Sequence, residues 1–584
     1  MKQVVGIDLG TTHTAAATLD GEEPVVLKVP QLVARGQLDA RALLPSFLYF
    51  AHESEGALPL PWDERRRFAV GELARERALE APARVVSSAK SWLCHDGVDR
   101  RGAILPPGAP EDVEKISPVE ASFRYLDHLG EAWQAEHGAP LGEQEVILTV
   151  PASFDAAARD LTVEAAYAAG LDDVALLEEP QAALYAWIAS VGDGWRQHLS
   201  PGDVVLVIDI GGGTTDFSAI AVEESDGVLS LRRIAVGDHI LLGGDNMDLT
   251  LSHVLAQKLG KLDRWQMAAL SHACRGAKER LLSDDSVHTV PIAIAGKGSS
   301  LLGSTLSTEL TRGEVETVLV KGFFPESAVT ELPAKRARAG LTQLGLPYAA
   351  DPAITKHLAA FLTRQARAVE GGGALLRPTA VLFNGGVVKS KTLRQRLLGV
   401  LNGWLAADGA PAARVLPGDD PELAVARGAA YFGMVKKGRG LRIRGGTARA
   451  YYVGIESPAP AIPGFEPPVV ALCVAPFGME EGTHAELPPH ELGLIVGEPV
   501  RFRFFGSSVR RDDAAGAELD DPSELDELSP IEVTLPAEGR TEGDVVPVRL
   551  SAQVTAVGTL LLEAVPFEPL NADERWKIEL SVRG

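Results

Sequence analysis

The sequence predicts an α/β architecture over residues 1–438, followed by a C-terminal β-sandwich domain. Strand-like and helix-like stretches alternate in the first part, for example at Glu145–Val150 and in the helical run Ala156–Ala169. After about residue 440 the pattern changes to short strand-like runs, with turns that contain Pro, Gly and Asp and with no long helical period. These runs are Val500–Phe505, Ile531–Leu535, Val545–Val557, Thr559–Val565 and Trp576–Val582.

Two glycine-rich turns, nearly two hundred residues apart, read almost alike. In Val4–Thr12 and in Val205–Asp216, an apolar strand reaches an aspartate and then runs into Gly and Thr. Glycine lets backbone N–H groups approach an anion closely, and threonine adds hydroxyl donors. The aspartates, Asp8 and Asp209, would face a hydrated Mg²⁺ rather than the phosphate. The repetition favours a duplicated half-domain that closes on a nucleoside triphosphate over two unrelated hairpins with capping aspartates.

The composition excludes several classes of protein. The net charge of −23 argues against nucleic acid as a partner, because phosphate contacts need basic residues. The N-terminus carries no signal-peptide pattern, and no run reaches the roughly 18 apolar residues of a membrane span, so we expect a cytoplasmic protein with no membrane partner. Cys94, Cys274 and Cys473 lack metal-ligand spacing and are expected to be reduced thiols.

The sequence places domain boundaries at changes in composition. We expect lobe I over about 1–200, lobe II over about 201–400 and a closing segment over 401–438. The basic, glycine-rich stretch that follows predicts a linker over 439–446, ahead of a β-rich domain over 447–584 that binds a substrate or a partner. Residues 321–370 form an insertion to which the sequence assigns no role.

Several motifs occur in one order along the chain. They are Gly6–Thr12, Leu148–Ala152, Glu178–Ala183, Asp209–Asp216, Leu242–Asp248, Phe383–Gly386 and Pro421–Ala430. With these motifs the chain resembles the DnaK-type heat-shock chaperones, the seventy-kilodalton heat-shock family. The wider actin and sugar-kinase superfamily shares the two phosphate turns, but not Pro151 with the Glu179-Pro180 pair in this form.

The resemblance implies a two-lobed, actin-like ATPase domain built on duplicated halves, with ATP or ADP and Mg²⁺ in the central cleft. The catalytic residues that it implies are Asp8, Lys90, Glu179, Asp209 and Thr214, with Asp8 and Asp209 holding Mg²⁺ through water. Lys90 falls beside the γ-phosphate, and Glu179 falls where a carboxylate orients the attacking water. The implied nucleotide-binding residues are Gly10, Thr11, Thr12, His13, Gly211, Gly212, Gly213, Thr214, Gly243, Gly244, Asp245, Lys278, Gly385, Gly386 and Lys389.

Some assignments leave alternatives. Lys90 could be a surface helix residue, and Glu178 would replace Glu179 if the alignment slipped by one, although Pro180 argues against a slip. The His13 imidazole either approaches a phosphate or is a polar residue of the cleft wall. The adenosine region departs from the family pattern, because Arg275 stands where Glu is frequent and Glu279 where Arg is frequent.

The end of the chain departs further. The linker is basic and poor in apolar side chains, so we expect it to dock weakly, and the chain reaches Trp576–Val582 where the family continues into a helical lid. The first hypothesis is a slow chaperone-like ATPase that binds unfolded or extended polypeptide, with the J-type co-chaperone and exchange factor that the resemblance implies. The second is a nucleotide-dependent scaffold or switch for a dedicated protein partner, and the third is a small-molecule kinase.

Overall fold

The computed structural model of the chain divides into two compact units. It describes residues 2–95, 97–225, 228–296, 305–335, 346–366, 373–418, 420–439, 443–444, 447, 449–456, 467–479, 483–488, 492–528, 530–537, 539–555, 559–571 and 574–581. Unit 1 comprises residues 1–152, 158–229 and 237–442, and unit 2 comprises residues 153–157, 230–236 and 443–584. The predicted domain limits at 438 and 446 remain predictions.

The first sheet of unit 1 is built around a strand hairpin at the start of the chain. Its order is β11 (Val174–Glu178), β10 (Glu145–Val150), β1 (Val4–Leu9), β2 (His13–Asp20) and β3 (Glu23–Val26). β1 runs parallel to β10 and antiparallel to β2. β1 and β10 are almost entirely buried, which explains why their sequences are nearly continuous apolar runs.

The second sheet of unit 1 repeats this arrangement. Its strands follow the order β18 (Arg414–Val415), β17 (Ala380–Asn384), β12 (Val204–Ile210) and β13 (Thr215–Ser225). β12 is buried throughout, runs parallel to β17 and pairs antiparallel with β13. In both sheets, therefore, the hairpin turn carries the glycine-rich motif, and the first hairpin strand has a parallel neighbour on its other side. We call the parts around the two sheets the first half and the second half of unit 1.

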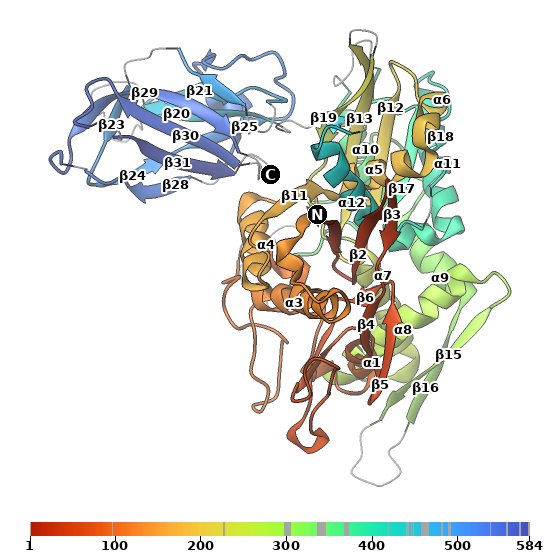
Figure 1. The fold of residues 1–584 in the computed structure, drawn as a ribbon. Helices are drawn as coiled ribbons and strands as arrows, with labels where there is room; N and C mark the ends of the chain where they lie inside the picture. The colour runs from red at the N-terminus through yellow and green to blue at the C-terminus, as the bar shows by residue number, and fades with distance from the viewer. Residues whose placement is uncertain are drawn as a thin grey trace. The chain divides into compact units, whose positions relative to one another are not determined.

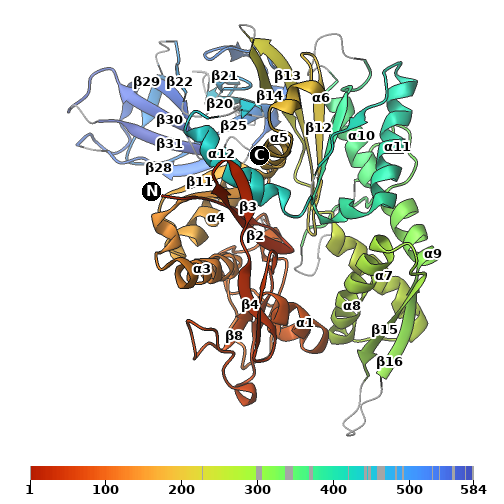
Figure 2. The same cartoon turned by 45° about the vertical axis from the view of Figure 1, so that its right-hand side comes forward.

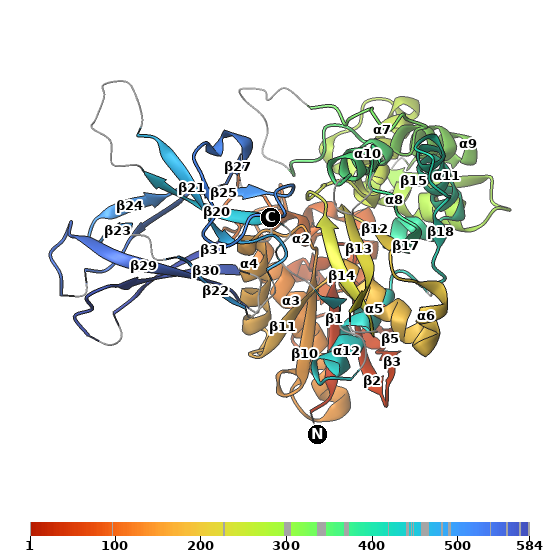
Figure 3. The same cartoon turned by 90° about the horizontal axis from the view of Figure 1, so that it is seen from above.

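Two helices lie beside the central strands of the two sheets (Figure 3). α12 (Ala424–Lys436) packs against β1 and against α5 (Glu179–Val191), and α5 also contacts β12. The approach is close because glycines stand at the contacts. A Cβ on Gly6 would lie 2.2 Å from the Ala430 nitrogen, and a Cβ on Gly428 would lie 1.7 Å from the Ala182 oxygen.

A helical layer with a hairpin forms one end of unit 1 (Figures 1 and 2). α7 (Gly244–Leu259) packs on α8 (Arg264–Ser283), and α8 contacts β15 (Thr289–Ala295), which pairs with β16 (Thr305–Thr311). α1 (Glu72–Glu80), from the first half, also packs on α8. None of the described helices combines the length and the apolar character that crossing a membrane requires.

The first 439 residues contain further strands and α-helices. They are β4 (Val29–Ala34), β5 (Gln37–Arg41), β6 (Leu44–Pro45), β7 (Leu48–Phe50), β8 (Phe68–Val70), β9 (Val85–Val86), α2 (Ala89–Trp92), α3 (Pro118–His137), α4 (Ala156–Ala168), α6 (Trp195–His198), β14 (Val228–Val236), α9 (Arg312–Val315), α10 (Ile354–Arg364) and α11 (Lys391–Ala407). Of these, β6 pairs with β2, and β14 follows β13 in the second sheet.

Unit 2 contains two antiparallel sheets that share one apolar core. The first sheet has the order β26 (Glu518–Leu519), β21 (Val469–Ala475), β20 (Ala450–Glu456), β25 (Phe504–Ser507) and β27 (Asp526–Glu527). The second sheet has the order β22 (His484–Glu486), β29 (Val545–Val554), β30 (Thr559–Pro566) and β31 (Trp576–Ser581). In the second sheet, β23 (Leu492–Ile495) also pairs with β29. The shared core includes Tyr451 and Phe504 from the first sheet and Leu562 and Trp576 from the second. Tyr452, one residue on, faces a separate cluster on the opposite side, as the two-residue period of a strand requires. The described residues after 443 contain no α-helix.

The predicted strand Val500–Phe505 is wrong as a single element. The segment forms two strands, β24 (Pro499–Phe502), which pairs with β28 (Ile531–Thr534), and β25, which pairs with β20 and β27. The chain leaves one sheet for another at Arg503, so the ladder must break there. Of the other predicted strands, the ends at 556–557 and 582 lie outside the described residues.

Part of the predicted linker forms a short strand. Ile443 is only 4% exposed, and the weak docking of the linker on the ATPase lobes stays a prediction. Ile443 and Arg444 form β19 (Ile443–Arg444), which pairs in parallel with Leu231 and Arg232 of β14 inside unit 2. Main-chain pairing needs no particular side chain, so composition alone does not reveal this strand. Linker residues 440–442 and 445–446 lie outside the described residues.

The close contact between α12 and α5 predicts the effect of a methyl group. Gly428→Ala should destabilise unit 1 by about 1–3 kcal/mol or more, because the added Cβ meets backbone atoms that cannot rotate away. Gly130→Ala is the matched control, since Gly130 lies within α3 and its Cβ would meet nothing within 4 Å. The control should gain up to about 1 kcal/mol from helix propensity. Thermal unfolding measures both, and equal melting temperatures would contradict the packing argument.

Candidate functional site

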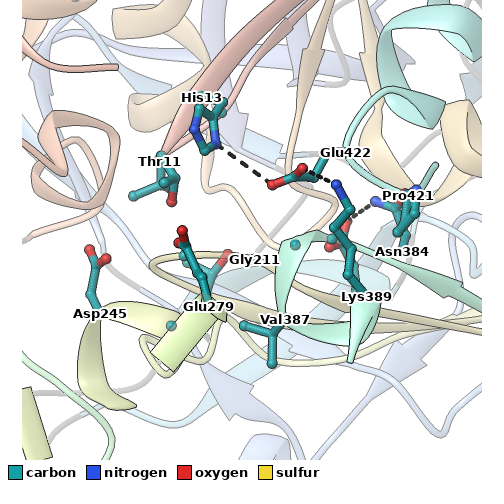
Figure 4. A pocket seen from close by; sticks show the side chains of 18 of the residues that line it. Thr11, His13, Gly211, Asp245, Glu279, Asn384, Val387, Lys389, Pro421 and Glu422 are labelled. Atoms are coloured by element: carbon teal, nitrogen blue, oxygen red, sulfur yellow. Dashed lines mark hydrogen bonds and ion pairs between the residues drawn. The ribbon is translucent and has the colours of Figure 1, made fainter. Parts of the chain in front are cut away.

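A cavity of about 440 Å³ opens between the two halves of unit 1, and both glycine-rich turns line it (Figure 4). Most residues predicted for the nucleotide site line this cavity. They are Asp8, Gly10, Thr11, Thr12, His13, Lys90, Glu179, Asp209, Gly211, Gly212, Thr214, Gly244, Asp245, Lys278, Gly385, Gly386 and Lys389. The structure thus brings together, in one cavity, predicted residues from the first half and from the second half of unit 1.

Two predicted glycines, Gly213 and Gly243, are not part of the cavity lining. A Cβ on Gly213 would lie 2.6 Å from the Ser91 Oγ, so this turn is covered from the first half. A Cβ on Gly243 would lie 2.6 Å from the carbonyl oxygens of Gly211 and Gly212. Both glycines therefore shape the second turn by allowing close contact, and neither faces the cavity.

Three carboxylates converge at the bottom of the two hairpins. Asp8 is in β1, Asp209 is in β12, and Glu179 begins α5. Burial and the Glu179 charge raise the pKa of Asp8 to about 7, although Lys90 and a hydrogen bond from Thr149 act in the opposite direction. Burial and the Glu179 charge also raise the pKa of Asp209 well above its ordinary value. Both aspartates therefore hold their protons more tightly than a solvent-exposed aspartate does.

Lys90 supplies a positive charge to this cluster. Its Nζ lies 2.5 Å from the Glu179 carboxylate, and both side chains are largely buried. Burial lowers the pKa of Lys90, but the charges of Glu179 and Asp8 outweigh it, so the pKa lies above its ordinary value. Lys90 is therefore not a surface helix residue. Glu178 is 2% exposed, lies 3.4 Å from Arg159, and is absent from the cavity lining, so Glu179 is the carboxylate at the site.

The chemistry of the cluster fits a hydrated Mg²⁺ next to phosphate. Buried carboxylates with raised pKa values gain from a nearby divalent cation. Within the described part of the chain, the Asn384 Oδ1 and the Thr12 Oγ1 are buried without a hydrogen-bond partner, which leaves an acceptor and a hydroxyl for a ligand. No group of three or more His, Cys, Asp or Glu in the described ranges could hold a metal ion by itself.

The far end of the cavity carries an ionic network around α8. The Arg275 guanidinium lies 2.5 Å from Asp245 and 3.0 Å from Asp248. The Lys278 Nζ lies 2.7 Å from Asp248 and donates to the Gly244 carbonyl at 3.2 Å. Arg275 therefore neutralises acidic residues of α7 here, and Glu279, one turn further along α8, faces the cavity (Figure 4).

His13 is neutral at physiological pH. Burial lowers its pKa to about 3, and the charges of Arg75, Arg275 and Lys389 act in the same direction. Its Nδ1 lies 3.8 Å from Glu422, so the contact is not an ion pair in the neutral state. The imidazole can offer a hydrogen bond to a phosphate but no charge.

Lys389 lines the cavity and points toward Glu422 (Figure 4). Its Nζ lies 2.5 Å from Glu422 and 3.2 Å from Asp420. The side chain is 44% exposed, so the pairing positions it at the rim of the cavity.

Comparison with known proteins identifies the family of the chain. A family model described as Hsp70 protein matches residues 4–329, more than half of the chain. The chain belongs to the Hsp70 family. Chaperone protein HscA of Pectobacterium carotovorum is 32% identical over 306 residues, which cover 50% of this chain and 44% of that protein. The Chaperone protein HscA homolog of Methylococcus capsulatus is 34% identical over 332 residues, 54% of this chain and 48% of that protein. The chain spans about half the length of the curated relatives that it matches, and the predicted family is confirmed.

Three of the cavity-lining residues to which the sequence assigned no role are polar or charged and contact predicted site elements. Asn384 donates to Asp209 at 2.6 Å, and Glu422 holds Lys389. Both lie inside motifs that the sequence singled out, so a role could have been assigned to them from position. Arg75 of α1 lines the cavity with no motif around it, and only the contact of α1 with α8 reveals it.

The insertion at 321–370 also approaches the site. The Ala349 N–H donates to the Leu241 carbonyl at 3.1 Å, directly before Leu242 and Gly243. Asp351 is buried and accepts from the backbone N–H groups of Ala334 and Ala353. Asp351 therefore joins the two described parts of the insertion, 321–335 and 346–366, and Ala349 braces the segment that leads into α7.

The raised pKa of Asp8 predicts a pH dependence of stability in the metal-free Hsp70 chain. The folded state holds the Asp8 proton more tightly than the unfolded state does, because the pKa is about 7 against an ordinary 3.8. The protonated Asp8 therefore adds to the free energy of unfolding, and this stabilisation is fully present below about pH 4 and is lost as the pH rises through about 7. Asp8→Asn cannot ionise, so its melting temperature should exceed that of the parent by an amount that grows over this range.

Thermal unfolding in chelator across this pH range tests the effect. Asp20→Asn is the control, since Asp20 is an exposed residue at the end of β2. A difference between Asp8→Asn and the parent that stays constant with pH would contradict the raised pKa.

Proposed function

We propose that the chain binds ATP with Mg²⁺ and hydrolyses it to ADP and phosphate, on a two-lobed, actin-like domain built on duplicated halves. Support comes from the common strand order of the two sheets and from the glycine-rich turn at the same place in each. The ATPase domain is residues 1–438, the linker 439–446, and residues 447–584 form a β-sandwich. The observation that carries the proposal is the convergence of Asp8, Lys90, Glu179 and Asp209 in a single cavity.

Each residue of the cluster takes a role that its surroundings favour. The turns at Gly10–Thr12 and Gly211–Thr214 present backbone N–H groups and hydroxyls to the phosphates. Asp8 and Asp209 orient water molecules of the Mg²⁺ shell. A bound Mg²⁺ neutralises charge on the phosphate oxygens.

The reaction itself depends on Lys90 and Glu179. Phosphoryl transfer to water is governed by positioning and by charge stabilisation on the transferred group. Lys90 provides a buried positive charge beside that group, and the Glu179 carboxylate accepts a hydrogen bond from the attacking water. The ion pair between them fixes both side chains before substrate arrives.

We further propose that nucleotide state controls binding of an unfolded or extended polypeptide, or of a dedicated partner, to the β-rich domain. A sheet edge can accept an extended segment through main-chain hydrogen bonds. The names of the HscA relatives support a chaperone role. An alternative is a partner-specific switch or scaffold, and the intact cluster favours turnover over a scaffold without hydrolysis. A J-type co-chaperone and an exchange factor are further proposed partners.

Substitution of Lys90 and of Glu179 should separate chemistry from binding. Lys90→Ala and Glu179→Gln should each slow single-turnover ATP hydrolysis by on the order of 100-fold, because both act on the transferring group. The Kd for Mg·ATP should change far less. Lys258→Ala is the matched control, since Lys258 pairs with Glu314 at 2.6 Å elsewhere in unit 1 and should leave turnover unchanged.

Parent-like hydrolysis in both variants would contradict these roles, and absence of a thermal shift with Mg·ATP in the parent would contradict nucleotide binding itself. Adding an unfolded peptide to the same hydrolysis assay distinguishes the chaperone-like function from the partner-specific switch. Faster turnover supports the chaperone-like function, and turnover with no response supports the partner-specific switch.

A further inference from the structure

Ser88 has an unusual backbone conformation. It is the only non-glycine residue with positive φ among the described residues, with φ 54° and ψ 30°. A serine in this left-handed region costs about 1–2 kcal/mol relative to ordinary helical geometry, so a compensating contact is expected. Ser88 is also the N-cap of α2, the four-residue helix that carries Lys90. Its conformation therefore sets the direction in which α2 leaves the preceding strand, β9 (Val85–Val86).

The compensating contact reaches the other half of unit 1. The Ser88 hydroxyl donates to the Asp245 Oδ2 at 2.5 Å, across 157 residues of sequence. Asp245 is in the first turn of α7, and its other oxygen lies 2.5 Å from the Arg275 guanidinium. The Asp245 side chain is 14% exposed and both its oxygens are engaged, so it is a firmly held acceptor.

A second contact joins α2 to the same part of the second half. Gly213 leaves just enough space for the Ser91 hydroxyl, since a Cβ on Gly213 would lie 2.6 Å from the Ser91 Oγ. Ser88 and Ser91 flank Lys90 in sequence and both face the second half, one toward α7 and one toward the second glycine-rich turn. Lys90 is therefore held in the first half by its backbone, and its neighbours Ser88 and Ser91 contact the second half.

We infer that Ser88 is a positioning residue for hydrolysis, which places Lys90 through its hydrogen bond to Asp245. This inference rests on the proposed ATPase function. When the two halves hold the Ser88–Asp245 bond, the left-handed turn is stabilised and the Lys90 Nζ stays beside Glu179. When the bond is lost, the Ser88 backbone relaxes toward a commoner region, α2 reorients and Lys90 leaves its place.

Three substitutions at Ser88 separate the hydrogen bond from the backbone strain. Asn tolerates the left-handed region and its amide can donate to Asp245, so Ser88→Asn should retain near-parental single-turnover hydrolysis. Ser88→Gly removes the strain and the donor together, and Ser88→Ala removes the donor but keeps the strain. We expect the rate to fall in the order Ser, Asn, Gly, Ala, with a loss of about tenfold or more in Ala, as a lost bond to a charged acceptor predicts. The Kd for Mg·ATP should change less than the rate.

The dependence on Asp245 gives a second measurement. In an Asp245→Ala background, Ser88→Ala should cause little further loss, because its partner is already absent. Ser190→Ala is the control, since the Ser190 hydroxyl donates to the Trp187 carbonyl of its own helix. It should hydrolyse ATP like the parent.

Several results would overturn the inference. They are parent-like hydrolysis in Ser88→Ala, equal rates for Ser88→Gly and the parent, equal losses in Kd and rate, and additive effects of Ser88→Ala and Asp245→Ala. If the parent hydrolyses ATP and Lys90→Ala does not, these results overturn the positioning role of Ser88 and leave the proposed ATPase function standing. A parent that fails to hydrolyse ATP overturns the proposed function and this inference together.

Discussion

The repulsion among three buried carboxylates is the interaction on which the site depends. Asp8, Glu179 and Asp209 come from different elements, and burial together with their mutual charge raises the pKa values of both aspartates. Lys90 balances only part of this charge. Such a cluster lowers the stability of the empty protein, and a cation with phosphate groups relieves the repulsion. The geometry is therefore arranged for a bound state rather than for the stability of the free chain.

Close backbone approach is the structural means of bringing these groups together. Glycine at 212 lets Thr12 of the first half approach, because a Cβ there would lie 1.7 Å from the Thr12 Oγ1. Gly385, with φ 90°, passes so near to Asp209 that a Cβ would lie 2.6 Å from its Oδ1. The two hairpins can thus present their turns to a common cavity, while α5 and α12 fill the space behind them. A larger residue at position 212 would push Thr12 away from the second turn, and one at position 385 would push Asp209 out of its place in the carboxylate cluster.

Sequence predicted the parts of the site that depend on local pattern. The hairpin turns and the ends of β1 and β12 follow from strand-to-turn spacing, whereas Lys90 and Glu179 were implied by the resemblance to the heat-shock family. Contacts between distant side chains could not be predicted this way. The partner of Ser88 is 157 residues away, and Lys389 pairs at the cavity with Glu422, which lies 33 residues further along the chain. The same limit explains the break at Arg503 and the pairing of Ile443, since both are set by which sheet the backbone joins and not by composition.

Proton release on nucleotide binding tests the central role of the carboxylate cluster most directly. Titration calorimetry of Mg·ADP at pH 7, in two buffers of different ionisation enthalpy, counts the protons released. The account predicts release by the parent and less release by Asp8→Asn, because an aspartate with a pKa of about 7 must ionise to face the cation. Equal proton release by the parent and the variant, or none by either, would contradict it.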